Sequence, residues 1–173
     1  MSEASDLCIK CKKRRQQFPG MFCGKCTQTA YHGIYNGVLL RGKNPGDVAN
    51  AEDIRFMFLW WDAECATCGA SLSLQVDHII PLSSADFPGS RIDNLMPLCK
   101  VCNMNKFDHE LETWLVMRFG SIQAALTLRK IRRYQADASA WLAYGESHHG
   151  KYYGAEILNK LLNHRLRISI DRS

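Results

Sequence analysis

The sequence predicts an α+β fold in which small cysteine-bound modules are combined with helices. Three observations support this prediction: all eight cysteines fall into C-x-x-C pairs, one run after Ser71 alternates like a strand, and two long stretches show helical apolar spacing. A chain of 173 residues is long enough for one substantial domain or two small ones. We divide it into an N-terminal knuckle and helix at 1–41, a core at 50–120 and a helical C-terminal extension at 121–173.

The four cysteine pairs predict two structural zinc sites, because four thiolates delivered as two C-x-x-C knuckles match the tetrahedral geometry of zinc. Redox-active pairs are the alternative, but the surrounding sequence has no thioredoxin-like pattern. The first predicted site comprises Cys8, Cys11, Cys23 and Cys26, and the second comprises Cys65, Cys68, Cys99 and Cys102. The segment up to residue 26 has too few apolar residues for a core of its own, so we expect its folding to depend on its metal.

A helix is predicted directly before the second cysteine site. Asn50 is a suitable N-cap, and the helix should run to about Asp62. Its spacing places Ile54, Phe58 and Trp61 on one side, which is typical of a helix that packs on a core.

The region within and after the second site should begin with a strand. The run 72–80 alternates between apolar and polar residues, and Pro81 ends it. A loop follows at 83–94, and we expect one helix from about 99–103 to a stop at Gly120. Ser121 should then cap a further helix to about residue 144, and shorter helices are expected at 27–40 and 155–166.

Polar residues stand in a specific order between and after the knuckles of the second site. VDHIIPL at 76–82 is followed by DNLMPLC at 93–99, and Asn103 and Lys106 come after the last cysteine. This order resembles the HNH endonuclease family, whose motif reads as an Asp-His pair, a middle Asn-Leu and C-x-x-C-N-x-x-K. The resemblance covers about 65–106 and implies a ββα-metal nuclease core. In such a core a hairpin precedes a helix, zinc clamps the two together, and a catalytic metal lies between strand and helix.

The resemblance also implies roles for single residues. Asp77 and Asn103 become ligands of the catalytic divalent metal, His78 the general base, and Asn94 the residue that braces the hairpin loop and orients His78. Asn103 stands where the third letter of the motif is histidine. Because carboxylate and amide oxygens are hard ligands, we expect Mg²⁺ or Mn²⁺.

General chemistry agrees with a phosphodiesterase at this site. A neutral imidazole suits the removal of a proton from water near neutral pH, and a metal ion would neutralise charge on the departing 3′ oxygen. The products should therefore carry 5′-phosphate and 3′-hydroxyl ends. Neighbouring strand residues point to opposite faces, so we expect a distorted backbone near Asp77 and His78. Lys106, one turn after Asn103, either contacts a phosphate or is an ordinary exposed lysine.

We predict DNA as the partner, with restriction-type, phage-encoded, homing and junction-resolving roles all open. The formal net charge of +5 slightly favours a polyanionic ligand. The basic residues expected to contact nucleic acid lie between the first cysteines: Lys12, Lys13, Arg14 and Arg15. The basic run at 129–133 is more simply explained as a solvated face.

A homodimer is also predicted, because one hydrolytic centre cuts one strand of a duplex and a two-fold dimer fits duplex symmetry. The helix at 54–61 or the segment 122–144 would supply its apolar contact. No apolar run reaches the length of a membrane span and the first residues lack a signal-peptide pattern, so we expect no membrane association and a cytoplasmic location. The competing interpretation is a non-catalytic, zinc-dependent nucleic-acid-binding or regulatory protein, in which Asp77, His78 and Asn103 are incidental.

Overall fold

The computed structural model describes residues 48–147. The predicted N-terminal zinc site, the basic residues within it and the C-terminal stretch lie outside the described residues. These predictions concern Cys8, Cys11, Cys23, Cys26, Lys12, Lys13, Arg14 and Arg15, the helices at 27–40 and 155–166, the whole of the region 1–41 and residues 148–173 of the C-terminal region.

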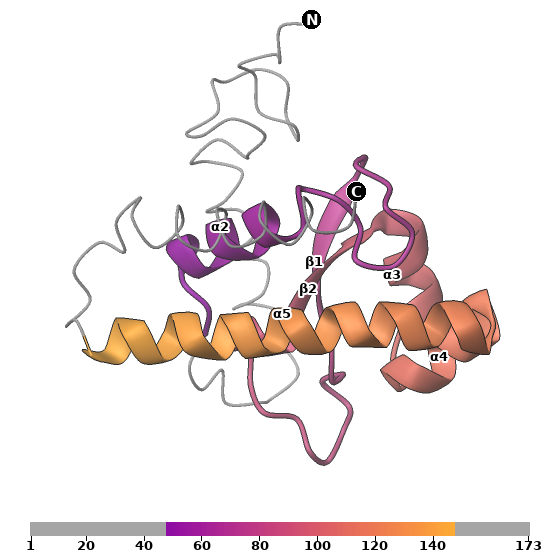
Figure 1. Ribbon diagram of the computed structural model, residues 1–173. Helices are drawn as coiled ribbons and strands as arrows, with labels where there is room; N and C mark the ends of the chain where they lie inside the picture. Colours follow the sequence, from indigo (N-terminus) through magenta and orange to yellow (C-terminus); the bar gives the residue numbers. More distant parts are fainter. Residues whose placement is uncertain (1–47, 148–173) are drawn as a thin grey trace, which may run out of the picture.

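A two-stranded antiparallel sheet lies at the centre of the described part (Figure 1). Strand β1 (Leu74–His78) pairs with β2 (Leu95–Cys99), so that Leu74 faces Cys99 at one end and His78 faces Leu95 at the other. All five residues of β2 are buried. The 3-10 helix η1 (Ile92–Asn94) leads from the long connecting loop into β2. This hairpin, followed by helices, confirms the α+β prediction.

Helix α2 (Ala51–Trp60) begins where the sequence predicts it. The Asn50 side chain accepts hydrogen bonds from the backbone N–H groups of Glu52 and Asp53, and Asp53 accepts one from Asn50 in return, which forms a capping box. The helix ends two residues before the predicted boundary, because Asp62 and the residue after it adopt positive φ angles of 54° and 52°.

The apolar side of α2 is buried against other parts of the same chain. Five of its residues or immediate successors are no more than 2% exposed: Ile54, Phe56, Met57, Phe58 and Trp61. They pack against the hairpin and against the last helix in one hydrophobic cluster. The expectation that this helix offers spare apolar surface for a dimer contact is therefore wrong.

The single helix expected up to Gly120 is also wrong, because the chain forms two helices there. Helix α3 (Lys100–Lys106) ends at Phe107, whose φ of 45° leaves the helical region. Helix α4 (Leu111–Phe119) starts anew with the Glu110 carboxylate accepting hydrogen bonds from the N–H groups of residues 112 and 113. Gly120, with φ 78°, ends α4 as predicted.

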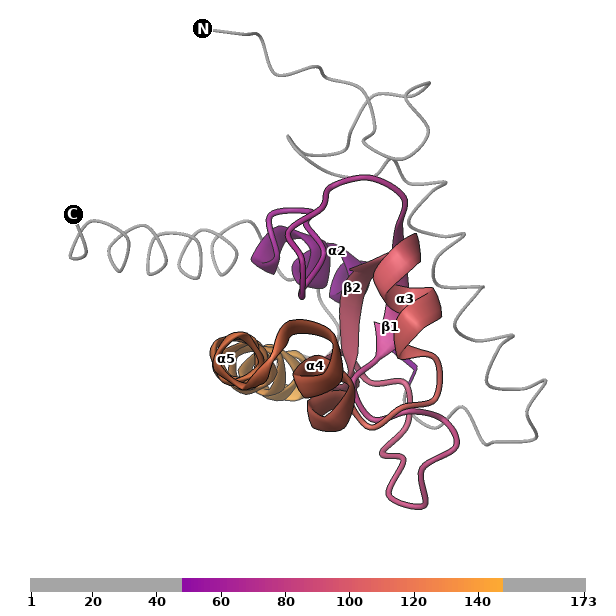
Figure 2. The same cartoon turned by 90° about the vertical axis from the view of Figure 1, so that its right-hand side faces the viewer.

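Helix α5 (Ser121–Ser147) follows at once, with Ser121 as its first residue rather than its cap. The helix lies on one side of the hairpin and α3 lies on the other (Figure 2). Its buried face recurs at helical spacing and comprises Ala124, Thr127, Ile131, Tyr134, Ala138 and Trp141.

Hydrogen bonds tie α5 to distant parts of the core. The Tyr134 hydroxyl donates to the carbonyl of Ile92 at 2.7 Å, and Trp141 Nε1 donates to Asp53 Oδ1 at 2.8 Å. These bonds link α5 to η1 and α2, so the helix is part of the core that supports the hairpin. Within residues 48–147, no helix combines the length and apolar character needed to cross a membrane.

Candidate active site and metal centre

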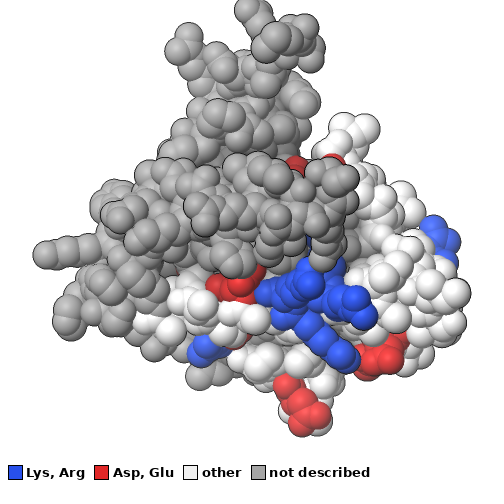
Figure 3. Space-filling model, in the orientation of Figure 1, with Lys and Arg blue, Asp and Glu red and all other residues white. Residues whose placement is uncertain are grey.

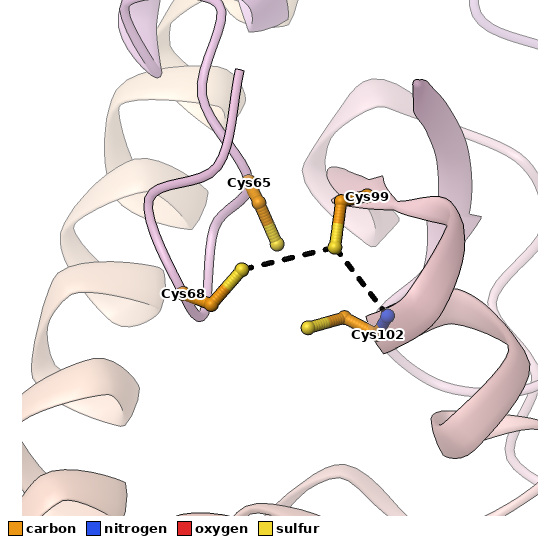
Figure 4. Close-up of side chains that lie close together, drawn as sticks. All are labelled: Cys65, Cys68, Cys99 and Cys102. Atoms are coloured by element: carbon orange, nitrogen blue, oxygen red, sulfur yellow. Dashed lines mark hydrogen bonds between the residues drawn. The ribbon is translucent and has the colours of Figure 1, made fainter. Parts of the chain in front are cut away.

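Four cysteine thiols gather at the end of the hairpin where Leu74 faces Cys99 (Figure 4). Cys65 and Cys68 come from the turn before β1, whereas Cys99 ends β2 and Cys102 lies in the first turn of α3. Their sulfur atoms all lie within 4.8 Å of one another.

The sulfur geometry fits a metal centre and not a disulfide. The Sγ atoms of Cys68 and Cys99 are 3.7 Å apart, whereas disulfide sulfurs are separated by about 2.05 Å. Four sulfurs at about 2.3 Å from a tetrahedral zinc ion lie about 3.8 Å from one another. The described cluster is therefore positioned to hold one zinc ion.

The backbone around the cysteines explains how the two knuckles meet. Gly69, with φ 74°, turns the first knuckle back, and the N–H of Ala66 donates to the carbonyl of Pro97 in β2 at 2.8 Å. Cys99 is the N-cap of α3, and its sulfur accepts from the N–H of Cys102 at 3.4 Å. One residue therefore ends the sheet, starts the helix and presents a thiol.

The protein environment already favours one thiolate. Burial raises the pKa of the Cys65 thiol, but hydrogen bonds, chiefly from the Thr67 side chain, outweigh it and lower that pKa to about 7. Burial raises the pKa of Cys68 and Cys102. Because zinc binds thiolates, binding would release the protons that these two thiols otherwise hold.

A cleft of about 280 Å³ opens between β1 and α3. Its lining residues are Asp77, His78, Pro81, Leu82, Asn103, Met104, Phe107 and Asp108. Three of the predicted site residues, Asp77, His78 and Asn103, thus share one cavity. Pairing stays regular up to His78 opposite Leu95, so the expected distortion does not take the form of a bulge, and β1 simply ends at His78.

Asp77 is paired with a lysine that the solvent does not reach. Its Oδ2 lies 3.0 Å from the Nζ of Lys106, whose side chain is 0% exposed. Burial raises the pKa of Asp77, and the Lys106 ammonium opposes that rise. Neither expectation for Lys106 fits this position, because a fully buried ammonium is neither an exposed lysine nor placed to contact a phosphate.

Asn103 is held by a neighbour on the strand. Its Nδ2 donates to Oε1 of the exposed Gln75 at 2.8 Å. With the amide nitrogen engaged in this way, the amide oxygen is the atom that remains to act as a ligand in the cleft.

His78 is oriented from the far end of the connecting loop. Its Nε2 lies 2.9 Å from the hydroxyl of Ser90, a residue that is 0% exposed. The Phe87 ring meets the imidazole edge to face, with centroids 5.2 Å apart. Contacts on two sides therefore fix the imidazole plane.

Asn94 closes the base of the same loop. Its Oδ1 accepts from the N–H of Ile80 at 2.9 Å, and its Nδ2 donates to the carbonyls of Gly89 at 2.9 Å and Ile80 at 3.3 Å. These hydrogen bonds join the two ends of the loop that carries Ser90, so Asn94 can act on His78 through that loop.

Sequence reasoning missed six residues that line the cleft or hold its predicted members: Gln75, Phe87, Ser90, Met104, Phe107 and Asp108. Gln75 stands two residues before Asp77 on a strand and so shares its face, which was an available signal. Ser90 lies in a loop with several polar residues, and no spacing rule distinguishes it.

Positive charge gathers away from the cleft. Figure 3 shows Lys and Arg side chains grouped over α5, where Arg129, Lys130, Arg132 and Arg133 are exposed. Lys130 Nζ lies 4.6 Å from the ring centroid of Trp61, a cation–π contact. This basic surface lies on α5, on the opposite side of the hairpin from α3. It therefore does not line the cleft between β1 and α3.

The cleft itself carries negative charge. Among the described residues that line it, none is a lysine or arginine, and two are the carboxylates Asp77 and Asp108. An anionic phosphate needs a cation to enter such a cavity, so the donor set fits a divalent metal held by oxygen ligands.

Comparison with known proteins agrees with this geometry. A family model described as HNH endonuclease matches residues 65–108, from the first cysteine of the cluster to Asp108 in the lining of the cleft. No curated protein and no solved structure matches the chain. The match confirms the resemblance in the segment that carries the hairpin, the cysteine frame and the cleft. We therefore assign residues 65–108 as an HNH endonuclease domain, which implies a nucleic-acid substrate.

Proposed function

We propose that this chain is a metal-dependent DNA endonuclease that hydrolyses phosphodiester bonds and leaves 5′-phosphate and 3′-hydroxyl ends. One observation carries the proposal: the cleft between β1 and α3 brings together Asp77, His78 and Asn103, which offer a carboxylate, an imidazole and an amide oxygen.

Asp77 and Asn103 are the residues that would hold the catalytic metal. Both offer oxygen atoms, and hard oxygen ligands favour Mg²⁺ or Mn²⁺ over softer metals. When bound, such an ion supplies Lewis-acid stabilisation of the phosphate charge that the acidic cleft cannot supply itself.

His78 is the proposed general base. It takes the proton from the attacking water, a role for which imidazole is the side chain best matched to neutral pH. Ser90 is a positioning residue, because its hydroxyl contact fixes the imidazole plane. Asn94 positions Ser90 in turn by closing the loop between Ile80 and Gly89.

Lys106 is proposed as a positioning residue for Asp77 rather than as a phosphate contact. Its ammonium holds the Asp77 carboxylate in the lining of the cleft and favours the ionised form that a metal requires.

Plasmid nicking with Mg²⁺ or Mn²⁺ tests the proposal against the non-catalytic alternative. We expect nicked and then linear DNA from the wild-type chain and ends that ligase can reseal, which requires 5′-phosphate and 3′-hydroxyl. His78→Ala is the matched control for a contaminating nuclease. DNA binding without nicking by the wild-type chain would favour the non-catalytic interpretation.

A homodimer remains part of the proposal. With α2 buried in the core, the segment 122–144 is the other predicted contact, and among its described residues Ile122 and Leu126 are exposed and apolar. Sedimentation of the full chain decides the mass, and sequencing of the cut ends shows whether cuts are paired at symmetric sites. A monomeric mass together with scattered nicks would reject the homodimer, whereas the proposed nuclease activity would stand.

A further inference from the structure

Phe107 adopts a backbone conformation that suits glycine. It follows the last residue of α3 with φ 45° and ψ −125°, and the N–H of His109 donates to the carbonyl of Lys106 across it at 2.9 Å. These values match the first central position of a type II′ turn, where glycine is favoured because a Cβ atom crowds the backbone. A bulky residue at positive φ is an outlier that calls for an explanation.

Packing does not explain why a phenylalanine stands at this turn. The Phe107 side chain is 71% exposed, so burial in the core compensates for little of the strain. Glycine would relax the backbone, and a polar residue would suit the solvent better. Strained residues that packing does not explain gather at functional sites.

The position of Phe107 supplies an explanation. The residue lines the cleft that contains Asp77 and His78. Met104, one turn earlier on α3, lines the same cleft and is 68% exposed. One wall of the acidic cleft is therefore an exposed apolar surface. A nucleic-acid strand bound with its phosphate at His78 would meet this wall.

The chemistry of that wall selects one part of a nucleic acid. Apolar side chains do not bind phosphate, whereas the faces of nucleobases stack on aromatic rings. A base inside an intact duplex is covered on both faces, so it offers its face to Phe107 only when it is unpaired or readily unstacked. The tight turn at residues 106–109 fixes the backbone that carries the ring, which reduces the backbone entropy lost when a nucleic-acid strand binds.

We propose that Phe107, supported by Met104, stacks on the nucleobase next to the scissile phosphate and makes the enzyme prefer strands in which that base is unpaired. The proposal rests on the nuclease function proposed above. It names the substrate class as DNA with a local defect beside the cut: a bulge, a mismatch or a single-stranded junction.

The test compares two oligonucleotide duplexes of the same sequence, one fully paired and one with a single unpaired base next to the cut position mapped with the wild-type protein. Single-turnover cleavage and binding are measured for wild type, Phe107→Gly and Phe107→Trp. Leu72→Gly is the matched control, because Leu72 is also 71% exposed in a loop but does not line the cleft.

We expect Phe107→Gly to bind the unpaired substrate about 10- to 100-fold more weakly, which is the range for loss of one stacked base, and to lose the preference over the paired duplex. Its melting temperature should rise, because the strain at the turn is relieved. Phe107→Trp should keep the preference, and Leu72→Gly should leave it unchanged.

Two results would overturn the inference. If an active Phe107→Gly enzyme still prefers the unpaired substrate to the same extent, the stacking inference is rejected and the proposed nuclease function stands. A fall in melting temperature with Phe107→Gly would show that the ring serves the fold. Failure of the wild-type chain to cut either duplex or a plasmid would instead reject the proposed function, and with it this inference.

Discussion

The Oδ2 atom of Asp77 and the Nζ atom of Lys106 lie 3.0 Å apart, with the lysine fully buried beneath the cleft. The pair joins β1 to the last turn of α3, the two elements that form the walls of the site. A buried cation beside a proposed metal ligand neutralises part of the charge that attracts the metal, yet it also opposes the rise in the pKa of Asp77 that burial causes, and it holds the carboxylate in place.

Lys106→Met should therefore destabilise the fold and alter the metal response. Removal of one partner leaves a largely buried carboxylate without its counter-ion, which costs about 3 kcal/mol or more. Urea unfolding measures the loss, and added Mn²⁺ should recover part of it by replacing the lost charge. Lys100→Met is the matched control, because Lys100 is an exposed lysine on the same helix. Equal effects of the two substitutions would contradict a special role for the buried pair.

His78→Ala should lower the cleavage rate by about 10²- to 10⁴-fold, the usual range for loss of a general base. Zinc content and DNA binding should change little, because the proposed role of the imidazole is proton transfer and not zinc binding or DNA affinity. Ser90→Ala should lower the rate by a smaller factor, since it loosens the imidazole without removing it. Single-turnover kinetics at saturating metal measure both, and full activity in purified His78→Ala protein would reject the assignment.

Gln75→Met should raise the metal concentration needed for half-maximal activity about 10-fold or more, as is typical when a residue that orients a metal ligand is removed. The substitution removes the oxygen that accepts from Asn103 Nδ2, so the amide is free to turn its nitrogen toward the metal. Gln75→Glu retains an acceptor and should keep a low metal requirement. Titration with Mn²⁺ gives the curves, and identical curves for wild type and Gln75→Met would exclude this positioning role.

Elemental analysis of the whole chain should find two tightly bound zinc ions, one for each cysteine set. Cys99→Ser should remove one ion and unfold the nuclease domain, because Cys99 also ends β2 and caps α3. Cys8→Ser should remove the other ion with a milder effect on the described domain. Circular dichroism monitors the folding, and one zinc ion per wild-type chain would reject the N-terminal site.

Tyr134 should make the fold sensitive to alkaline pH. Burial, together with the charges of Asp93 and Asp53, raises the pKa of the Tyr134 hydroxyl well above its usual value near 10. The folded state therefore keeps the proton, so this contribution to stability is complete below about pH 10 and declines as pH rises further.

Tyr134→Phe separates that effect from the hydrogen bond to Ile92. Below pH 9 the variant should be less stable by about 1–3 kcal/mol, because the buried Ile92 carbonyl loses its donor. The difference should narrow as pH rises past 10, since the variant has no hydroxyl to ionise at this position. Urea unfolding between pH 7 and 11 measures both curves, and a constant gap would contradict the role of the buried hydroxyl.

The parts of the site that sequence could predict depend on short-range patterns. Each of these parts lies within a few residues or within one motif. They are the capping box of Asn50 and Asp53, the paired cysteines, and the order of Asp77, His78 and Asn103. Such patterns have fixed spacing because helices, knuckles and strands impose it.

The parts that sequence could not predict depend on contacts between distant residues, or on a helix break that no glycine or proline marks. The break between α3 and α4 contains neither glycine nor proline, so nothing in KFDHE at 106–110 announces it. The burial of Lys106 follows from how α3 packs on β1, and the contact of Trp141 with Asp53 spans 88 positions. Single-sequence periodicity carries no information about such pairings.

The bridge that Asn94 makes between Ile80 and Gly89 separates the loop into a hydrogen-bonded base and an exposed tip. Residues 83, 85 and 86 are exposed and lie beyond the base, whereas Phe87 and Ser90 return to the imidazole. Insertions at the tip would lengthen the loop without moving the groups that hold His78. The tip is thus the place where evolution or an engineer would graft a longer recognition element onto an unchanged hydrolytic site.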